Sequence, residues 1–504
     1  VKETGHEFIY RNEVTKFRNI ALRGPWTSGG IEFNFGVIGH APHTATPVDY
    51  TLVENGDGSV SCWVGSMDLP SRTHWRVEIR LPPDRAYFET NVLWYNPTPL
   101  EQPYYNWMTA AAFARDDLEM TMPGNAYLQH SGEVEAWPLD VQGRYLPLYG
   151  NNTFGSHKSY HVVGELNDFF GGYYHDDDFG FGHWARHEDM PGQKLWLWSL
   201  ARDGGVWEEL LTDTDGQYVE FQAGRLFVQY SPGAHLNPIT QAGFDPMSAS
   251  RWTESWFPLE GIGGLTDASK EGAMFVEEEG GVLTVGVTAF RTIQDTLQVW
   301  SDDELVGTAP VNLEPLKPLR ATFDVLEGED FRVRLAGLKL DYESNPKGRE
   351  LKFRPFNRDL ELVPPLSETD QLVFQAKELM KARRYGEARE LFTEVHARDG
   401  SNREALLGLA ELAVRGGWAD LGSVWAGWAL QMNAYDARAN FLAGIGYRQL
   451  GSEADAMDAF GWAARSTAFR SAANIQLAEI MIGKGDLEEA RHYAQLAIDF
   501  DRYS

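Results

Sequence analysis

The segment YVEFQAG, at residues 218–224, places a carboxylate and an amide among strand-forming neighbours. Glu220 and Gln222 are two residues apart, so on a strand both side chains point to the same face. Apolar neighbours disfavour the charged form of a carboxylate and raise its pKa, which suits a general acid or base. We interpret Glu220 as a candidate acid–base residue with Gln222 beside it. A solvent-facing strand is the alternative reading.

A second candidate carboxylate lies in RWTESWFP. Glu254 stands between Trp252 and Trp256, and all three share one face of a strand. A carboxylate bracketed by aromatic rings is typical of a sugar subsite, whereas a surface glutamate on an edge strand is the alternative. Two carboxylates predict glycosidic bond cleavage by acid and base, with a separation of roughly 5 Å for retention and about 6.5 to 9.5 Å for inversion.

The stretch GGYYHDDDFGFGHWARHEDMPG contains three histidines and three consecutive aspartates. Two of the histidines are four residues apart, which suits a zinc site on a helix, but Gly and Pro interrupt this segment. The alternating acids of a calcium loop are absent. We therefore expect no metal. The remaining readings are a surface turn or a loop at the rim of a sugar site that offers His175 and Asp176 to hydroxyl groups, with Tyr174 as a stacking platform. His175 and Asp176 are also candidate catalytic residues, as acid and base if Glu220 does not have this role.

Four further residues are candidate ligand contacts. Glu32 follows two glycines, which allow close backbone approach, and is expected to bind a ligand rather than to catalyse. His40, Trp107 and His130 are weaker candidates, since a single histidine is more often structural.

Composition restricts the class of partner. The chain has 44 Lys and Arg against 73 Asp and Glu, a net charge of −29. Such a charge repels phosphate backbones, and no basic stripe is present, so no nucleic-acid partner is expected. Its 17 Trp residues suit stacking on sugar rings, although an aromatic-rich core explains them equally well. The composition favours a neutral carbohydrate.

Other classes of site are excluded by missing motifs. The only cysteine, Cys62, rules out a disulfide framework and a Cys-based zinc site. Nucleotide-binding and α/β-hydrolase motifs are absent, so no cofactor is predicted. No apolar run approaches the roughly 20 residues that span a bilayer, so no membrane partner is expected. We expect a cytoplasmic protein. The first residues read as the middle of a hairpin. This predicts that a preceding segment, which could have carried a targeting signal, has been trimmed.

The C-terminal part repeats with a period of 34 residues. Small residues recur at Ala376, Ala410, Gly444 and Ala478, and turn glycines recur at Gly417, Gly451 and Gly485. A period of 34 residues is typical of tetratricopeptide repeats, in which paired helices pack through small residues. Residues 366–504 are therefore predicted to form an α-solenoid. Its groove is expected to hold a peptide, a partner subunit such as a second copy of the chain, or the neighbouring β domain, and a scaffold without a ligand is the alternative.

The preceding residues predict β-structure. Residues 1–265 contain alternating or β-rich segments separated by Gly and Pro, which indicates a large antiparallel sandwich. Residues 266–360 contain shorter strands and predict a smaller β-sandwich module. The predicted fold class is multidomain β plus α.

The β domain followed by 34-residue repeats resembles a little-characterised bacterial family that combines a galactose-mutarotase-like β-supersandwich with tetratricopeptide repeats. The matching segments include RGPWTSGGIEFNFGVIGH, LWYNPTP, YYNWMTAA, HSGEVEAWP, FFGGYYHDDD, YVEFQAG and SWFPLEGIG. The resemblance implies that the first strands of the supersandwich are missing. It also implies a catalytic role for Glu220, whose place is similar to that of the catalytic glutamate in mutarotase-like domains.

Three functions are compatible with these residues. The leading hypothesis is a glycoside hydrolase acting on a neutral oligosaccharide or glycan, with Glu220 and Glu254 as acid and base. The second is an epimerase of the mutarotase type, with a histidine as acid and Glu220 as base. The third is a non-catalytic carbohydrate-binding protein whose repeats hold partners. Fold alone does not distinguish these functions.

Overall fold

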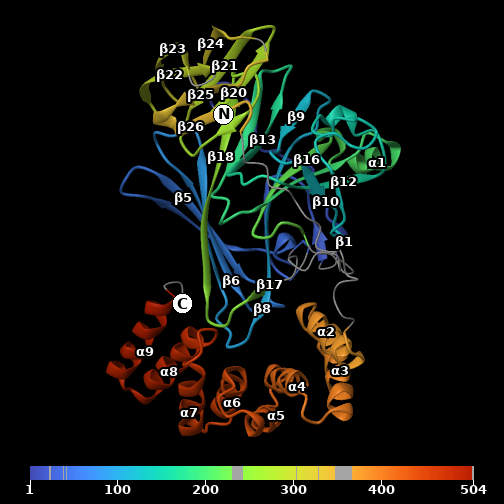
Figure 1. Ribbon diagram of the computed structural model, residues 1–504, viewed down its shortest axis with the longest axis vertical. Coiled ribbons are helices and arrows are strands. Elements are labelled where there is room, and N and C mark those ends of the chain that lie inside the picture. Colours follow the sequence, from blue (N-terminus) through green and yellow to red (C-terminus); the bar gives the residue numbers. More distant parts are fainter. Residues whose placement is uncertain are drawn as a thin grey trace.

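The structure is a computed structural model that describes residues 1–21, 24–37, 39–40, 42–229, 242–301, 304–326, 328–346 and 366–501. A large β-sandwich occupies the centre, a small β-sandwich covers one end, and an arc of helices covers the other (Figure 1). The predicted fold class, multidomain β plus α with a large β-sandwich, a small sandwich and a repeat solenoid, is confirmed.

Two eight-stranded antiparallel sheets form the supersandwich in the described part of the chain. The first sheet has the order β11 (Val134–Ala136), β10 (Ala126–Leu128), β12 (His157–Val163), β15 (Gly192–Trp198), β16 (Tyr218–Gly224), β8 (Gln102–Phe113) and β17 (Ala242–Phe244), with β3 (Ile31–Gly36) also paired to β8. The second has the order β4 (Asp49–Glu54), β5 (Val60–Met67), β6 (His74–Leu81), β7 (Phe88–Tyr95), β18 (Ala249–Glu260), β14 (Phe179–Trp184), β13 (Phe169–Tyr174) and β9 (Leu118–Thr121). A hairpin of β1 (Arg18–Ala21) and β2 (Gly24–Trp26) and helix α1 (Arg202–Leu211) flank the sheets.

The side chains of β16 alternate between two environments, the core between the two large sheets and the outer face of the first sheet. Val219, Phe221 and Ala223 point into the hydrophobic core between the two large sheets. Phe221 meets Trp256 of the opposite sheet, with ring centroids 5.8 Å apart. Because side chains alternate along a strand, Glu220 points to the other face of the first sheet, away from this core.

The small sandwich follows the supersandwich. One of its sheets contains β19 (Asp267–Ala268), β20 (Gly272–Glu279), β21 (Val282–Ala289) and β24 (Leu319–Asp324), and the other contains β23 (Glu304–Leu313), β22 (Ile293–Ser301), β25 (Phe331–Leu335) and β26 (Leu340–Glu343). Residues 347–360 of the predicted module lie outside the described residues.

Eight helices follow in four antiparallel pairs within residues 366–501. They are α2 (Glu368–Lys381), α3 (Tyr385–Arg398), α4 (Arg403–Arg415), α5 (Ala419–Met432), α6 (Ala437–Gln449), α7 (Glu453–Ala463), α8 (Arg470–Lys484) and α9 (Leu487–Phe500). A Cβ at Gly444 would come within 2.7 Å of the Phe460 ring, so the small residue of the repeat lets the paired helices approach. Gly451 has φ of 76° in the turn between α6 and α7, the two helices of one pair, where glycine avoids strain. In the described residues, none of the helices has the length and apolar character needed to cross a membrane.

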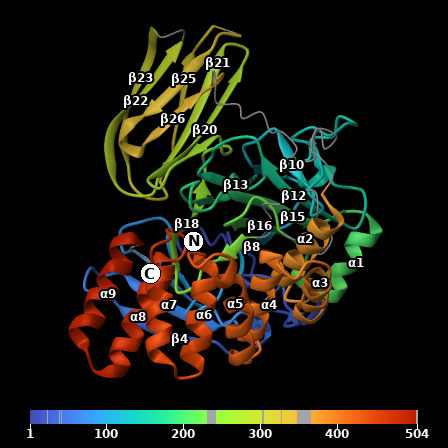
Figure 2. The same cartoon turned by 60° about the horizontal axis from the view of Figure 1, so that its bottom comes forward.

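The solenoid docks on the ends of the β-strands (Figure 2). Leu100 and Met247, from two loops of the supersandwich, belong to the same buried cluster as the apolar side chains of α4 and α6. Arg415 donates to the backbone carbonyl of Glu101, and Arg383 Nη1 donates to Gln102 Oε1 at 3.1 Å. The concave side of the helical repeats is therefore filled in part by the chain's own β domain.

Candidate functional site

A row of polar side chains crosses the outer face of the first large sheet. The strand registers place Glu32, Thr109, Gln222, Lys194 and His161 directly opposite one another, on β3, β8, β16, β15 and β12. Paired positions of neighbouring strands point to the same face. This arrangement, here called the polar row, brings together residues that are up to 190 positions apart in the chain.

Glu220 lies next to the polar row on β16 and is 6% exposed. Gln222 Nε2 donates to Glu220 Oε2 at 2.7 Å, and Gln229 Nε2 donates to Gln222 Oε1 at 2.7 Å. Burial raises the pKa of Glu220 to about 7, because the positive charges of Lys194 and His40 offset burial only in part. A carboxyl group in this range exchanges protons readily near neutral pH.

Lys194 is the buried cation whose charge acts most strongly on Glu220. It is 2% exposed and donates to Gln229 Oε1. Burial lowers the pKa of Lys194 to about 7, while the charge of Glu220 acts in the opposite direction. The two groups therefore share a buried, titratable environment on the outer face of the sheet.

Glu32 and His40 form a second titratable pair near Glu220. His40 Nδ1 lies 2.8 Å from Glu32 Oε2 and 2.9 Å from Oε1, and Thr44 donates its hydroxyl to Oε1 at 3.0 Å. The His40 ring stacks on Trp26 with centroids 4.6 Å apart. Burial opposes protonation of His40, but the Glu32 carboxylate outweighs burial and raises the pKa of His40 above 6.5.

Two neutral histidines lie at the other end of the polar row. His130 contacts the Gln229 carbonyl and the Ser159 hydroxyl, each at 3.1 Å, and burial lowers its pKa to about 4. His161 Nδ1 donates to the Leu128 carbonyl at 2.9 Å, and burial lowers its pKa well below 6.5. These hydrogen bonds hold both rings in fixed positions at this end of the polar row.

Trp107 also belongs to this face. Its indole lies against Gly224, where a Cβ would come within 2.5 Å of the ring, and meets His161 edge to face at 5.6 Å. Trp196 lies opposite Glu220 on β15 and is half-buried. The predicted contacts Glu32, His40, Trp107 and His130 therefore lie on the same side of the first sheet as Glu220 and Gln222, but Trp107 is fully buried, so its ring does not contact a ligand as expected.

Glu254 is not part of this face. It is fully buried between the two large sheets, where Trp252 Nε1 donates to Oε1 at 2.8 Å and His183 Nε2 lies 2.9 Å from Oε2. Trp252 and Trp256 pack in the same core. The expected pairing of Glu220 with Glu254 as acid and base is not what the structure shows, because the two carboxylates lie on opposite faces of the first sheet. The two tryptophans likewise line the core rather than a sugar subsite.

The expected rim loop is a tight hairpin between β13 and β14. His175 Nε2 lies 2.7 Å from Glu119 Oε2, and the Asp176 amide donates to Asp117 Oδ2 at 3.0 Å. Tyr174 is buried and donates its hydroxyl to the Phe113 carbonyl at 2.8 Å, so its ring is not available for stacking. The structure does not bring these residues to the Glu220 face, since β13 belongs to the second sheet.

The third aspartate of this hairpin has a structural role. Asp178 accepts from the Tyr173 hydroxyl at 2.6 Å, and Arg320 Nη2 of the small sandwich lies 2.5 Å from Oδ1 and 2.6 Å from Oδ2. The hairpin thus joins the two sandwiches. Within the described residues no group of His, Cys, Asp or Glu is arranged to hold a metal ion.

Sequence reasoning missed Lys194, Trp196 and His161. The segment QKLWLW, at residues 193–198, alternates in a way that places Lys194 and Trp196 on one strand face, which was a detectable signal. His161 alternates with the apolar Tyr160 and Val162 in a similar way, but this pattern alone did not distinguish it from a structural histidine. Only the pairing of β12 with β15 reveals its position.

Several solved structures are similar to this chain at low identity. A TPR-domain containing protein from Parabacteroides distasonis is 18% identical with a TM-score of 0.46, and the match covers 98% of this chain and 78% of that one. A candidate aldose 1-epimerase from Klebsiella pneumoniae is 12% identical with a TM-score of 0.32, covering 43% of this chain and 55% of that one. MamA from Desulfovibrio magneticus is 16% identical with a TM-score of 0.25, covering 27% of this chain and 76% of that one.

A family profile covers the supersandwich. The family described as a domain of unknown function (DUF5107) matches residues 1–259, more than half of the 504-residue chain. This range includes every residue of the polar row together with Glu220 and His40. The chain therefore belongs to the DUF5107 family.

Proposed function

We propose that the protein is a carbohydrate-processing enzyme of the aldose-epimerase type, with Glu220 as general base and His40 as general acid. The observation that carries this proposal is the buried Glu220 carboxyl, with a pKa of about 7, on the same sheet face as the Glu32–His40 pair. The family resemblance supports a catalytic role for a glutamate at this place. A neutral aldose is the substrate class that suits the strongly acidic chain.

The proposed chemistry is ring opening and closure. Glu220 accepts the proton of the anomeric hydroxyl as the bond between the anomeric carbon and the ring oxygen breaks, and protonated His40 gives its proton to that ring oxygen. The product is an open-chain aldehyde. Rotation about the adjacent carbon–carbon bond and the reverse proton transfers close the ring with the opposite anomeric configuration. Both residues regain their starting protonation states.

Neighbouring groups support these roles. Glu32 holds His40 through Nδ1 and favours its protonated form. Lys194 lowers the pKa of Glu220 and thereby increases the fraction of the base at neutral pH. Gln222 donates to one Glu220 oxygen, which fixes the carboxylate and leaves the other oxygen for the substrate.

Glycoside hydrolysis is the second candidate, with Glu32 in place of Glu254 as the second carboxylate. Glu32 and Glu220 point to the same face, from strands β3 and β16 that flank β8. Two inter-strand spacings separate the two strands by about 9.6 Å, and the residues are also offset by two positions along the strands, because Glu32 lies opposite Thr109 and Glu220 opposite Ala111. A carboxylate separation of about 6.5 to 9.5 Å would predict inversion.

The decisive experiment compares the wild type with Glu220→Gln on two kinds of substrate. Polarimetry with freshly dissolved aldoses measures anomer exchange, and product chromatography with neutral oligosaccharides measures bond cleavage. We expect catalysed anomer exchange that falls by about 10² to 10⁴-fold in kcat in the variant. The matched control is Glu188→Gln, a glutamate whose side chain is 72% exposed.

Oligosaccharide cleavage that depends on Glu220 and Glu32 would instead support the hydrolase. Sugar binding without either reaction would support a non-catalytic carbohydrate-binding protein. A correctly folded Glu220→Gln variant with nearly full kcat would refute the assignment of Glu220.

A further inference from the structure

A cavity of about 500 Å³ lies where two turns of the supersandwich meet the solenoid. The β domain contributes the turns that carry Arg72 and Leu100, and the solenoid contributes mainly the α2–α3 turn, α3, α4 and the α4–α5 turn. Four arginines line it, Arg72, Arg383, Arg389 and Arg415, and no aspartate or glutamate lines it in the part of the chain that the structure describes. This space, here called the arginine cavity, has the volume of a small-molecule site.

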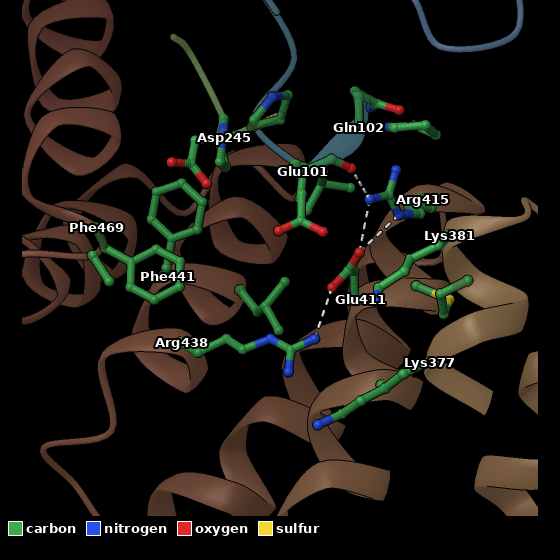
Figure 3. A pocket seen from close by; sticks show the side chains of 18 of the residues that line it. Glu101, Gln102, Asp245, Lys377, Lys381, Glu411, Arg415, Arg438, Phe441 and Phe469 are labelled. Carbon is green, nitrogen blue, oxygen red and sulfur yellow. Dashed lines mark hydrogen bonds and ion pairs between the residues drawn. The ribbon is translucent and has the colours of Figure 1, made fainter. Parts of the chain in front are cut away.

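The arginine cavity has an excess of positive charge, although the whole chain has a net charge of −29. Arg415 is neutralised by Glu411, with 2.7 Å between Nη2 and Oε1, and donates to the backbone carbonyl of Glu101 (Figure 3). Glu101 and Glu411 line the neighbouring cavity drawn in Figure 3 and not the arginine cavity. Arg72 and Arg389 form no ion pair with any described residue. An anion would therefore meet at least two guanidinium groups for which no carboxylate competes.

Aromatic rings hold three of the four guanidinium groups in place. The guanidinium carbons of Arg383 and Arg415 each lie 5.4 Å from the centroid of the Tyr385 ring. The guanidinium carbon of Arg389 lies 5.3 Å from the Trp418 ring. Contact with a ring face positions a guanidinium group without neutralising its charge. The cavity therefore presents cations that are held in position and remain able to bind an anion.

Arg383 stands where the other repeats have glycine. It precedes Gly417, Gly451 and Gly485 at the repeat spacing of 34 residues, and its φ of 59° is positive like their values of 79°, 76° and 79°. A residue with a side chain is strained in this conformation, which is why helices commonly end on glycine. Arg72, on the β-domain wall of the same cavity, has a φ of 60°. Such strain is concentrated at functional sites, so the two backbones point to a binding site independently of the charges.

We propose that the arginine cavity binds a small organic phosphate through Arg72, Arg383 and Arg389. A guanidinium group donates two N–H groups to phosphate oxygens, and one phosphate accepts from several arginines. The ligand would join the β domain to the solenoid, since these arginines come from both. The proposal is independent of the function proposed for Glu220. Apolar side chains suit the organic part of the ligand, and they include Leu69, Pro70, Leu100, Leu412 and Val414.

The test measures binding of glycerol 3-phosphate to the full chain by titration calorimetry. Salt at about 150 mM screens the repulsion from surface carboxylates that lie farther than about 8 Å from the ligand. Glycerol, which lacks the phosphate, serves as the ligand control. We expect saturable binding of glycerol 3-phosphate, no binding of glycerol, and a loss of about tenfold or more in affinity in Arg383→Gly and in Arg389→Gln.

The two variants differ in what they do to the fold. Arg383→Gly restores the glycine of the other repeats and relieves the strained backbone, so it should melt close to the wild type while binding is lost. Arg389→Gln changes an exposed side chain that lies over Trp418, so the test holds even if the turn variant folds poorly. The matched control is Arg465→Gln, because Arg465 is an exposed arginine 4.8 Å from the Trp462 ring and outside the cavity.

Two results would overturn the proposal. The first is an absence of saturable binding of glycerol 3-phosphate, or an affinity that is equal in Arg389→Gln and Arg465→Gln. The second is tighter binding of a pentaglutamate peptide than of glycerol 3-phosphate, which would assign the arginine cavity to an acidic peptide.

Discussion

Glu254→Ala tests whether this carboxylate stabilises the core or serves chemistry. The substitution removes the acceptor of two buried donors, Trp252 Nε1 at 2.8 Å and His183 Nε2 at 2.9 Å. All three residues are at most 4% exposed, so water cannot replace the lost acceptor without opening the core. The loss of hydrogen bonding is therefore not compensated by solvent.

The expected magnitude follows from these two contacts. A buried donor left without a partner costs about 1 to 3 kcal/mol, so two donors give about 2 to 6 kcal/mol. This is a large share of a typical unfolding free energy of about 5 to 15 kcal/mol. Glu254→Gln keeps an acceptor oxygen for one of the two donors and should lose about half as much.

Urea unfolding followed by tryptophan fluorescence measures this loss, because Trp252 and Trp256 lie in the same core. The control is Glu188→Ala on the surface, where a change within about 0.5 kcal/mol is expected. A Glu254→Ala variant within about 1 kcal/mol of the wild type in unfolding free energy, yet inactive toward sugars, would refute the reasoning and return Glu254 to the catalytic site.

Three further predictions concern pH and domain docking. Anomer exchange should rise as pH increases through about 7, where Glu220 becomes the base, and fall at higher pH as His40 loses its proton; a rate profile without the rising limb would contradict the role of Glu220. Because the pKa of His130 is lowered from 6.5 to about 4, its neutral form stabilises the fold above pH 6.5, and this contribution of about 3 kcal/mol is lost as pH falls toward 4. Urea unfolding at both pH values measures the loss, which should be smaller in His130→Gln. Leu100→Ala should weaken docking by about 2 to 5 kcal/mol, so limited proteolysis should release the helical repeats faster than in the wild type.

The solenoid could be predicted from the sequence because its determinants are local. Each repeat carries its own small residues, three of the four carry a turn glycine, and neighbours pack only on neighbours. Gly444 and Gly451 have the roles that the 34-residue period predicts, with close contact to Phe460 for the first and a positive φ for the second. No distant partner is needed to specify them.

The polar row required long-range pairing that the sequence does not display. Glu32 enters the site because β3 pairs with β8, and Lys194 enters because β15 pairs with β16. The period-2 pattern of each strand assigns side chains to two faces, but it does not say which strand lies next to which. The segment around His161 therefore does not predict that this residue lies in the polar row.

Glu220 and Glu254 show why local pattern also fails to separate a site from a core. Both are glutamates on strands with aromatic or apolar neighbours, and both have partners two residues away. They differ in what packs against the strand face on which each side chain lies. The second sheet covers the side of the first that carries Phe221, so Glu220 faces outward among titratable groups, whereas Glu254 points inward and is held by Trp252 and His183. The packing of sheet on sheet, rather than the composition of either strand, decides which carboxyl exchanges protons with a substrate and which one satisfies donors in the interior.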